Sequence, residues 1–234
     1  MLGKSKWRQP AWCALGAALL VSGCIYNPVA PVGQAVRESL VDGISDEMRG
    51  RLIHLRGMEY ALLYMRLPDR REAAFILAER GGSRAPDVWV GGDGVSIGID
   101  APYVNWTSGF ANDVEFLTTV RSGALRDFLQ QGKEFMFPGA PAVMWGRRKG
   151  YDAWIEQIAW NCDRQEVYYR GLAYEGPALL ITECVETTGR PGHFERKYWI
   201  DTRRRAVLRM TGPIWADSKP LYMEWVRVPD PAER

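Results

Sequence analysis

The sequence has 234 residues, of which 47% are hydrophobic and 25% are charged, and its formal net charge is +2. This length suits one good-sized domain with its own core. The nearly balanced charge lacks the basic excess of nucleic-acid-binding proteins, so we expect no nucleic-acid partner.

The first 23 residues have the pattern of a secretion signal. Three basic residues precede the apolar run Ala11–Val21, which is shorter than the roughly 20 apolar residues needed to span a bilayer. The run ends in Val21-Ser22-Gly23-Cys24, which fits the lipobox of bacterial lipoproteins. We therefore predict a lipoprotein signal peptide at residues 1–23 and a lipid on Cys24 that attaches the protein to a membrane.

The residue after Cys24 is Ile25, not the aspartate associated with inner-membrane retention in enteric bacteria. This favours the outer membrane, with the domain in the periplasm. Signal cleavage would remove three basic and no acidic residues, so the mature chain would carry a formal charge of −1. We expect a lipidated tether at 24–34, a single β-rich domain at 35–229 and a short tail at 230–234.

Cysteine usage agrees with export. Once Cys24 is acylated, the mature chain keeps Cys162 and Cys184, and an even pair in an oxidising compartment predicts a disulfide. A zinc site would need more ligands than these cysteines with His54 and His193. We therefore expect no metal and no cofactor.

Hydrophobic periodicity predicts mostly strands. A short amphipathic helix is expected at 35–49 and a second one at 124–132, where Leu125, Phe128 and Leu129 share one face before Gly132. The expected strands are 58–67, 72–80, a hairpin over 88–99, 114–120, 152–161, 166–174, 178–187, 194–201, 206–210 and 221–228.

Short polar turns separate these strands, among them "CDRQ" at 162–165 and "TRRR" at 202–205, and "YVNWTSGF" at 103–110 is interpreted as a loop. Strands in sequence with short turns predict antiparallel pairing. At least ten of them predict an all-β fold, a strongly curved sheet or a barrel-like meander, with one short N-terminal and one small internal helix.

Several of these segments resemble one family. "RKYWIDTRRRAVLRM" and "LYMEWVRV" are similar to the last strands of YjbF/GfcB-type lipoproteins of exopolysaccharide and group 4 capsule operons. "MEYALLYMRL", "AFILAE" and "VWVGGDGVSI" are similar to earlier parts of the same family, and the resemblance covers roughly 35–228. It implies an all-β lipoprotein that helps to assemble or export a surface polysaccharide, with polysaccharide or export-machinery proteins as partners, and it supplies no catalytic residues.

Two other functions stay open. Lipoprotein carriers of the LolA/LolB type also have a Trp-Ile-Asp strand before a hairpin, and a carrier would need a deep apolar cavity. A polysaccharide or cell-wall hydrolase would need two close carboxylates, for which Glu183 with Glu195, or Asp201 with Glu224, are candidates. We find no other catalytic motif and expect no enzyme activity.

Tryptophans are the best candidates for glycan contact, because a flat aromatic face stacks on the C–H surface of a sugar. Most tryptophans in a β protein fill the core. Trp106, in the predicted loop, and Trp199, on the expected polar face of its strand, are the candidates for exposed rings. The run Arg203–Arg205 is interpreted as a hairpin turn, with contact to an acidic polysaccharide or lipid headgroup as the alternative.

Overall fold

The computed structural model describes residues 60–66, 72–81, 85–91, 94–110, 113–172, 174–188 and 192–228. The predicted signal peptide, the tether with Cys24, the helix at 35–49, His54 and the tail at 230–234 lie outside these residues. None of the helices in the described part of the chain is long and apolar enough to cross a membrane.

The described residues form twelve strands and one helix. They are β1 (Leu62–Arg66), β2 (Glu72–Glu79), β3 (Asp87–Gly91), β4 (Ser96–Asp100), β5 (Tyr103–Ser108), β6 (Val114–Arg121), α3 (Ala124–Gln131), β7 (Ala142–Arg148), β8 (Ile155–Arg170), β9 (Glu175–Thr188), β10 (Gly192–Asp201), β11 (Ala206–Gly212) and β12 (Leu221–Arg227).

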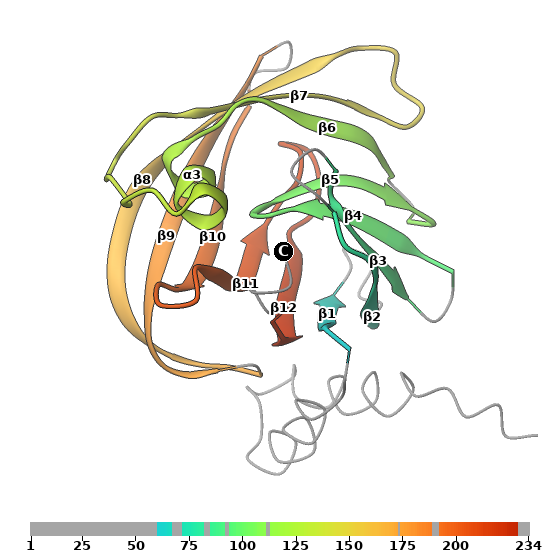
Figure 1. The fold of residues 1–234 in the computed structure, drawn as a ribbon. Coiled ribbons are helices and arrows are strands. Elements are labelled where there is room, and N and C mark those ends of the chain that lie inside the picture. The colour runs from blue at the N-terminus through green and yellow to red at the C-terminus, as the bar shows by residue number, and fades with distance from the viewer. Residues whose placement is uncertain are drawn as a thin grey trace, which may run out of the picture.

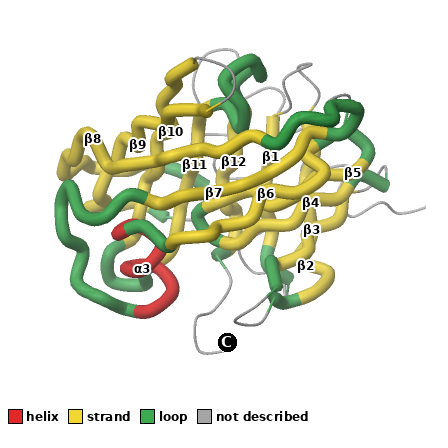
Figure 2. Tube along the Cα trace, turned by 90° about the horizontal axis from the view of Figure 1, so that it is seen from above, coloured by secondary structure: helices red, strands yellow, loops and turns green. Residues whose placement is uncertain are grey.

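All strands belong to one antiparallel sheet with the order β5-β4-β3-β2-β1-β12-β11-β10-β9-β8-β7-β6. Strands that follow one another in sequence pair with each other except β5 and β6, and β1 pairs with β12. The sheet curves so far that its two end strands, β5 and β6, come to lie next to one another (Figures 1 and 2). The predicted all-β, barrel-like meander is therefore confirmed, and the line between β5 and β6 is hereafter called the seam.

The interior of the curve holds the main core. Buried side chains from most of the strands pack there, and the largest that are fully buried include Trp89, Tyr198 and Phe75. The helix α3 lies at one end of the barrel-like sheet (Figures 1 and 2) and buries Leu125, Phe128 and Leu129, as its sequence predicts. It ends at Gly132, whose φ of 68° is a left-handed conformation that favours glycine.

Three sequence interpretations need correction. "CDRQ" is not a turn, because β8 runs through it for 16 residues and stays paired with β9, and a bulge between Asn161 and Asp163 takes up the irregularity. "YVNWTSGF" is not a loop, because residues 103–108 form β5. The strand β7 was not predicted. In these segments, pairing with a long neighbour outweighs local propensity.

Candidate functional site

The seam is held together partly by side chains. The Nδ2 of Asn105 on β5 donates a hydrogen bond to the carbonyl of Leu117 on β6 at 3.1 Å. Near the other end of β5, the backbone N–H of Val114 donates to the Oγ1 of Thr107 at 2.8 Å. In both hydrogen bonds one partner is a side-chain atom, whereas paired strands of a sheet use backbone atoms on both sides. The distance between β5 and β6 is therefore not fixed by backbone pairing at these two points.

A pocket of about 600 Å³ lies at the seam, on the side of α3. This volume is within the range of ligand sites in proteins, which is about 300–1,000 Å³. The lining combines one indole ring, apolar side chains and many hydrogen-bonding groups. It includes Asp100, Asn105, Trp106, Phe116, Arg126 and Gln130. We call this cavity the seam pocket.

Trp106 is held in the seam pocket by its neighbour on β4. It pairs with Gly98 across the sheet, and a Cβ at position 98 would collide with the indole ring. The ring thus covers the backbone of Gly98, a position that only glycine fills without displacing it. Trp106 remains partly exposed, so one part of a rigid apolar ring faces the pocket.

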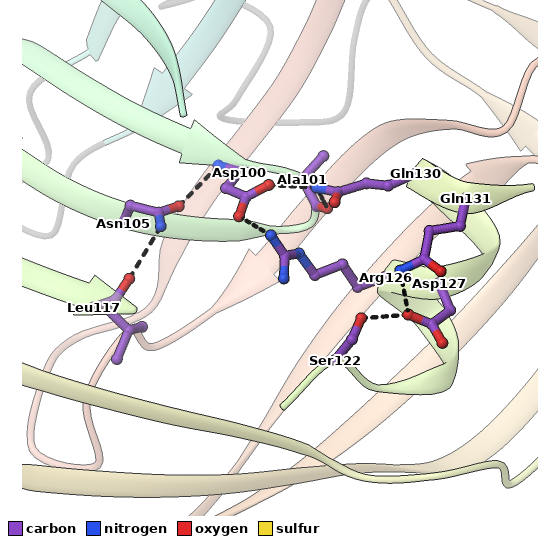
Figure 3. Close-up of polar contacts among 9 residues, drawn as sticks. All are labelled: Asp100, Ala101, Asn105, Leu117, Ser122, Arg126, Asp127, Gln130 and Gln131. Carbon is purple, nitrogen blue, oxygen red and sulfur yellow. Dashed lines mark hydrogen bonds and ion pairs between the residues drawn. The ribbon is translucent and has the colours of Figure 1, made fainter. Parts of the chain in front are cut away.

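The helix α3 is fastened to the far side of the pocket. Arg126 forms an ion pair with Asp100 at the end of β4, and Gln130 donates hydrogen bonds to Asp100 and, at 2.9 Å, to the carbonyl of Ala101 (Figure 3). The Oδ1 of Asn105 in turn accepts a hydrogen bond from the backbone N–H of Asp100 at 2.8 Å. One connected set of polar contacts therefore joins β4, β5, β6 and α3 around the pocket.

The first turn of α3 has its own support. Asp127 accepts hydrogen bonds from Ser122 and, at 3.0 Å, from Gln131 (Figure 3). It also accepts one from Lys133 at 2.7 Å. The hydrogen bonds from Lys133 and Ser122 lower the pKa of Asp127. The helix that presents Arg126 and Gln130 is thus fixed at its start.

The charges in the seam pocket balance. Two arginines, Arg80 and Arg126, and two aspartates, Asp87 and Asp100, line it. Arg126 pairs with Asp100, and Asp87 accepts a hydrogen bond from the backbone N–H of Gly81 at 2.8 Å. Such a lining suits a hydroxyl-rich, uncharged ligand segment better than a polyanion. An aromatic ring beside amide and hydroxyl groups can bind a sugar, because the ring packs against its C–H face and the polar groups form hydrogen bonds with its hydroxyls.

A second polar cluster lies inside the sheet. Glu183 on β9 is 1% exposed and accepts hydrogen bonds from the hydroxyls of Tyr103 and Tyr198 at 2.8 and 3.2 Å. Its Oε2 lies 3.5 Å from the Nη1 of Arg196, and the Nη2 of Arg196 donates a hydrogen bond to the Oε1 of Gln157 at 2.6 Å. Burial raises the pKa of Glu183, and it raises the pKa of both tyrosines, which therefore stay protonated as donors. The cluster therefore connects β5 with β9 and β10 through buried side chains.

Trp199, the other candidate for glycan contact, lies away from the seam pocket. It is on β10, partly buried beside a small cluster that includes Tyr169, and the guanidinium of Arg209 lies 5.3 Å from its ring. Arg209 also pairs with the buried Glu224 at 2.9 Å. The structure therefore does not bring Trp106 and Trp199 together, and it gives Trp199 a packing role.

The remaining candidate residues fall in separate places. Cys162 and Cys184 form a disulfide between β8 and β9. His193 is exposed on β10. In the described part of the chain, no group of three or more His, Cys, Asp or Glu side chains is placed to hold a metal ion.

The carboxylates considered for hydrolysis do not form pairs. Glu183 faces the interior, whereas Glu195, which pairs with Cys184 in the ladder, is exposed on the outer face. Asp201 accepts hydrogen bonds from the turn of its own hairpin, while Glu224 is bound by Arg209 and neighbouring tyrosines.

The three arginines occupy a hairpin turn, as predicted. β10 ends at Asp201 and β11 begins at Ala206, and the Oδ1 of Asp201 accepts hydrogen bonds from the backbone N–H groups of Arg203 and Arg204 at 2.9 and 3.2 Å. Arg205 has a φ of 52°, and its guanidinium lies against Gly132 at the end of α3. The turn is thus formed by Asp201, not by the arginine side chains.

Sequence reasoning found Trp106 but missed Asp100, Arg126 and Gln130. Arg126 and Gln130 are four residues apart on the polar side of the predicted helix, which was the available indication. Asp100 could not be joined to them, because the contact depends on the closure of the sheet.

With this geometry defined, comparison with known proteins adds one finding. Neither a family model nor a curated protein matches the sequence. Among solved structures, the chain is similar to the hypothetical lipoprotein YmcC of Escherichia coli K12, with a TM-score of 0.59 and 15% sequence identity. The match covers 77% of this chain and 89% of that one. The two proteins share a fold.

Proposed function

We propose that this protein is an outer-membrane lipoprotein, anchored through Cys24, that acts as a non-enzymatic accessory in the export or assembly of capsule or exopolysaccharide. The lipobox at 21–24 supports the anchor, and a protein described as a lipoprotein has the same fold. The resemblance of the strand and hairpin segments to YjbF/GfcB-type lipoproteins supports the link to polysaccharide.

One observation carries the glycan part of the proposal. The indole of Trp106 is fixed against Gly98 and lines an open pocket that combines apolar side chains with amides, hydroxyls and charged groups. In this proposal the pocket holds a sugar unit of the exported polymer, with Trp106 on its C–H face. Asn105 and Gln130, which line the same pocket, lie near the sugar's hydroxyls.

The packed interior favours this role over that of a lipid carrier. A carrier needs an apolar cavity for acyl chains, whereas the described interior contains tightly packed side chains such as Trp89, Phe75 and Met65, each at most 1% exposed. The Glu183 cluster adds buried charged and polar side chains to this interior, which are not the lining that acyl chains need. The seam pocket places amide, hydroxyl and charged groups among its apolar side chains, whereas an acyl-chain site is apolar throughout.

The test is binding of exopolysaccharide purified from the producing bacterium. Trp106→Ala should weaken binding by about tenfold, because the aromatic platform is lost. Gly98→Ala should weaken it in the same direction, since the new Cβ displaces the indole. Trp199→Ala is the matched control and should bind like the wild type. If Trp199→Ala weakened binding and Trp106→Ala did not, the assignment of the pocket would be wrong.

The cellular part of the proposal has its own test. Deletion of the gene should reduce surface polysaccharide, and a Cys24→Ser variant should fail to restore it because the protein would not be anchored. Restoration of normal export by that variant would contradict the role of the anchor.

A further inference from the structure

The outer face of the sheet beside the seam pocket carries exposed aromatic rings. Trp145 on β7 is 49% exposed, and Trp154, just before β8, is 61% exposed. Both are more exposed than core residues, and exposed apolar side chains that form a contiguous patch mark an interaction site.

These rings are continuous with the seam pocket. Phe116 on β6 lines the pocket, and its ring lies 5.3 Å from that of Trp154 at an interplanar angle of 64°. Thr118 of β6 pairs with Trp145, which pairs with Glu156 of β8, so these side chains share the outer face. We call Phe116, Trp145 and Trp154 the aromatic face.

Trp145 is held in place by a hydrogen bond. Its Nε1 donates to the Oε2 of Glu156 at 2.6 Å, although both groups are at the surface. A ring that is already fixed loses little conformational entropy when a ligand stacks on it. The same bond leaves the apolar surface of the indole open to solvent.

Charged groups lie among the rings. Glu115 forms an ion pair with Arg147, and Arg147 pairs with Phe116 in the ladder. Together with Glu156, these groups would lose water if the face entered a bilayer or a dry protein interface, and that loss is costly. A hydrated chain of hydroxyl-bearing sugars avoids the cost, because its hydroxyls can bind the carboxylates.

We infer that the aromatic face extends the seam pocket into one binding track for an extended glycan chain. The inference rests on the proposed function of the seam pocket and adds the class of ligand: an internal segment of a polymer, several sugars long. From β6 to β8 the track crosses about 10 Å of sheet, in addition to the pocket itself, which is more than a single sugar ring covers.

The experiment measures binding of the full-length lipoprotein in detergent to short and long fractions of the purified exopolysaccharide, the short ones being di- to tetrasaccharides. The wild type should bind the long fraction more tightly. The double variant Trp145→Ala/Trp154→Ala should lose about tenfold in affinity for the long fraction and keep its affinity for the short one. Trp106→Ala should weaken both.

Two further variants control for folding and for a general aromatic effect. Tyr168→Ala removes an aromatic side chain that is 72% exposed on β8, and it should leave binding of both fractions unchanged. Trp145→Phe keeps a ring and should retain most of the long-fraction affinity. An unchanged circular dichroism spectrum and melting temperature establish that each variant is folded.

The outcomes separate this inference from the proposed function. If the double variant binds the long fraction like the wild type while Trp106→Ala is weakened, the aromatic face is not part of the site and the proposed function stands. If the wild type binds neither fraction, both fail. If brominated phospholipids quench the fluorescence of the reconstituted wild type and the double variant loses that quenching, the face contacts the membrane, and the inference is overturned.

Discussion

Asn105 on β5 and Leu117 on β6 join the two ends of the sheet through one hydrogen bond of 3.1 Å, from the side-chain amide to the backbone carbonyl. The same amide accepts a hydrogen bond from the backbone of Asp100, at the end of the neighbouring strand. One side chain thus ties together both walls of the seam pocket. The closure of the seam at this point therefore depends on the side chain of Asn105.

Replacement of Asn105 should destabilise the fold. Asn105→Ala removes two hydrogen bonds and leaves two backbone groups without these partners, so we expect a loss of about 1–3 kcal/mol in the free energy of unfolding. Urea denaturation measures it. Ser108→Ala, at an exposed position of the same strand, serves as the control. Equal stability of the two variants would show that the bridge contributes nothing.

The buried Glu183 should make stability depend on pH. Burial raises its pKa in the folded state, against the opposing effect of Arg196. The folded protein then binds more protons than the unfolded chain, so the contribution of Glu183 is fully present below the ordinary pKa of a glutamate, about 4.3, and is lost as the pH rises through the raised value.

In Glu183→Gln the group that titrates is gone, so the free energy of unfolding of this variant should fall less than that of the wild type as the pH rises above about 4.3. Denaturant unfolding at a series of pH values measures the difference. Glu195→Gln, on the exposed face of the neighbouring strand, is the control. A wild type that gains stability relative to Glu183→Gln as the pH rises in this range would show that the direction is wrong.

The β10–β11 turn should depend on Asp201 and not on the arginines. Asp201→Ala leaves the N–H groups of Arg203 and Arg204 without their acceptor and should cost about 1–2 kcal/mol. The double variant Arg203→Ser/Arg204→Ser should change stability by less than about 0.5 kcal/mol, since these side chains are exposed. Thermal unfolding compares them, and the reverse order of the two effects would refute the interpretation.

The disulfide should stabilise the β8–β9 pair. It closes a loop with a sequence separation of 22 residues. In the chain-entropy model, this contributes about 3 kcal/mol. Cys162→Ala/Cys184→Ala should lose roughly that amount in chemical denaturation. Mass spectrometry after alkylation without reductant provides the direct check, because two free thiols in the mature protein would exclude the bond.

Local patterns predicted the elements whose structure is decided locally. The "GGDG" segment between β-rich runs correctly predicted the β3–β4 hairpin. The spacing of Leu125, Phe128 and Leu129 before Gly132 correctly predicted α3. Alternation along 194–200 placed Tyr198 inside and Lys197 outside. Each of these depends on residues close together in the chain.

Elements that depend on distant partners were harder to predict. The polar residues of "CDRQ" read as a turn, but strand β9 pairs with them throughout. Asn105 and Thr107 made β5 look like a loop, because their polar side chains serve the seam. The contact of Asp100 with Arg126 exists only because twelve strands close on themselves, which no short pattern encodes.

The central claim is that the seam pocket binds glycan. Hydrogen–deuterium exchange of the full-length lipoprotein, with and without the purified exopolysaccharide, tests it most directly because it locates the contact along the chain. We expect slower exchange in β5, β6 and α3, at residues 103–108, 114–121 and 124–131. Protection confined to β10 and β11 around Trp199, or no protection anywhere, would contradict it.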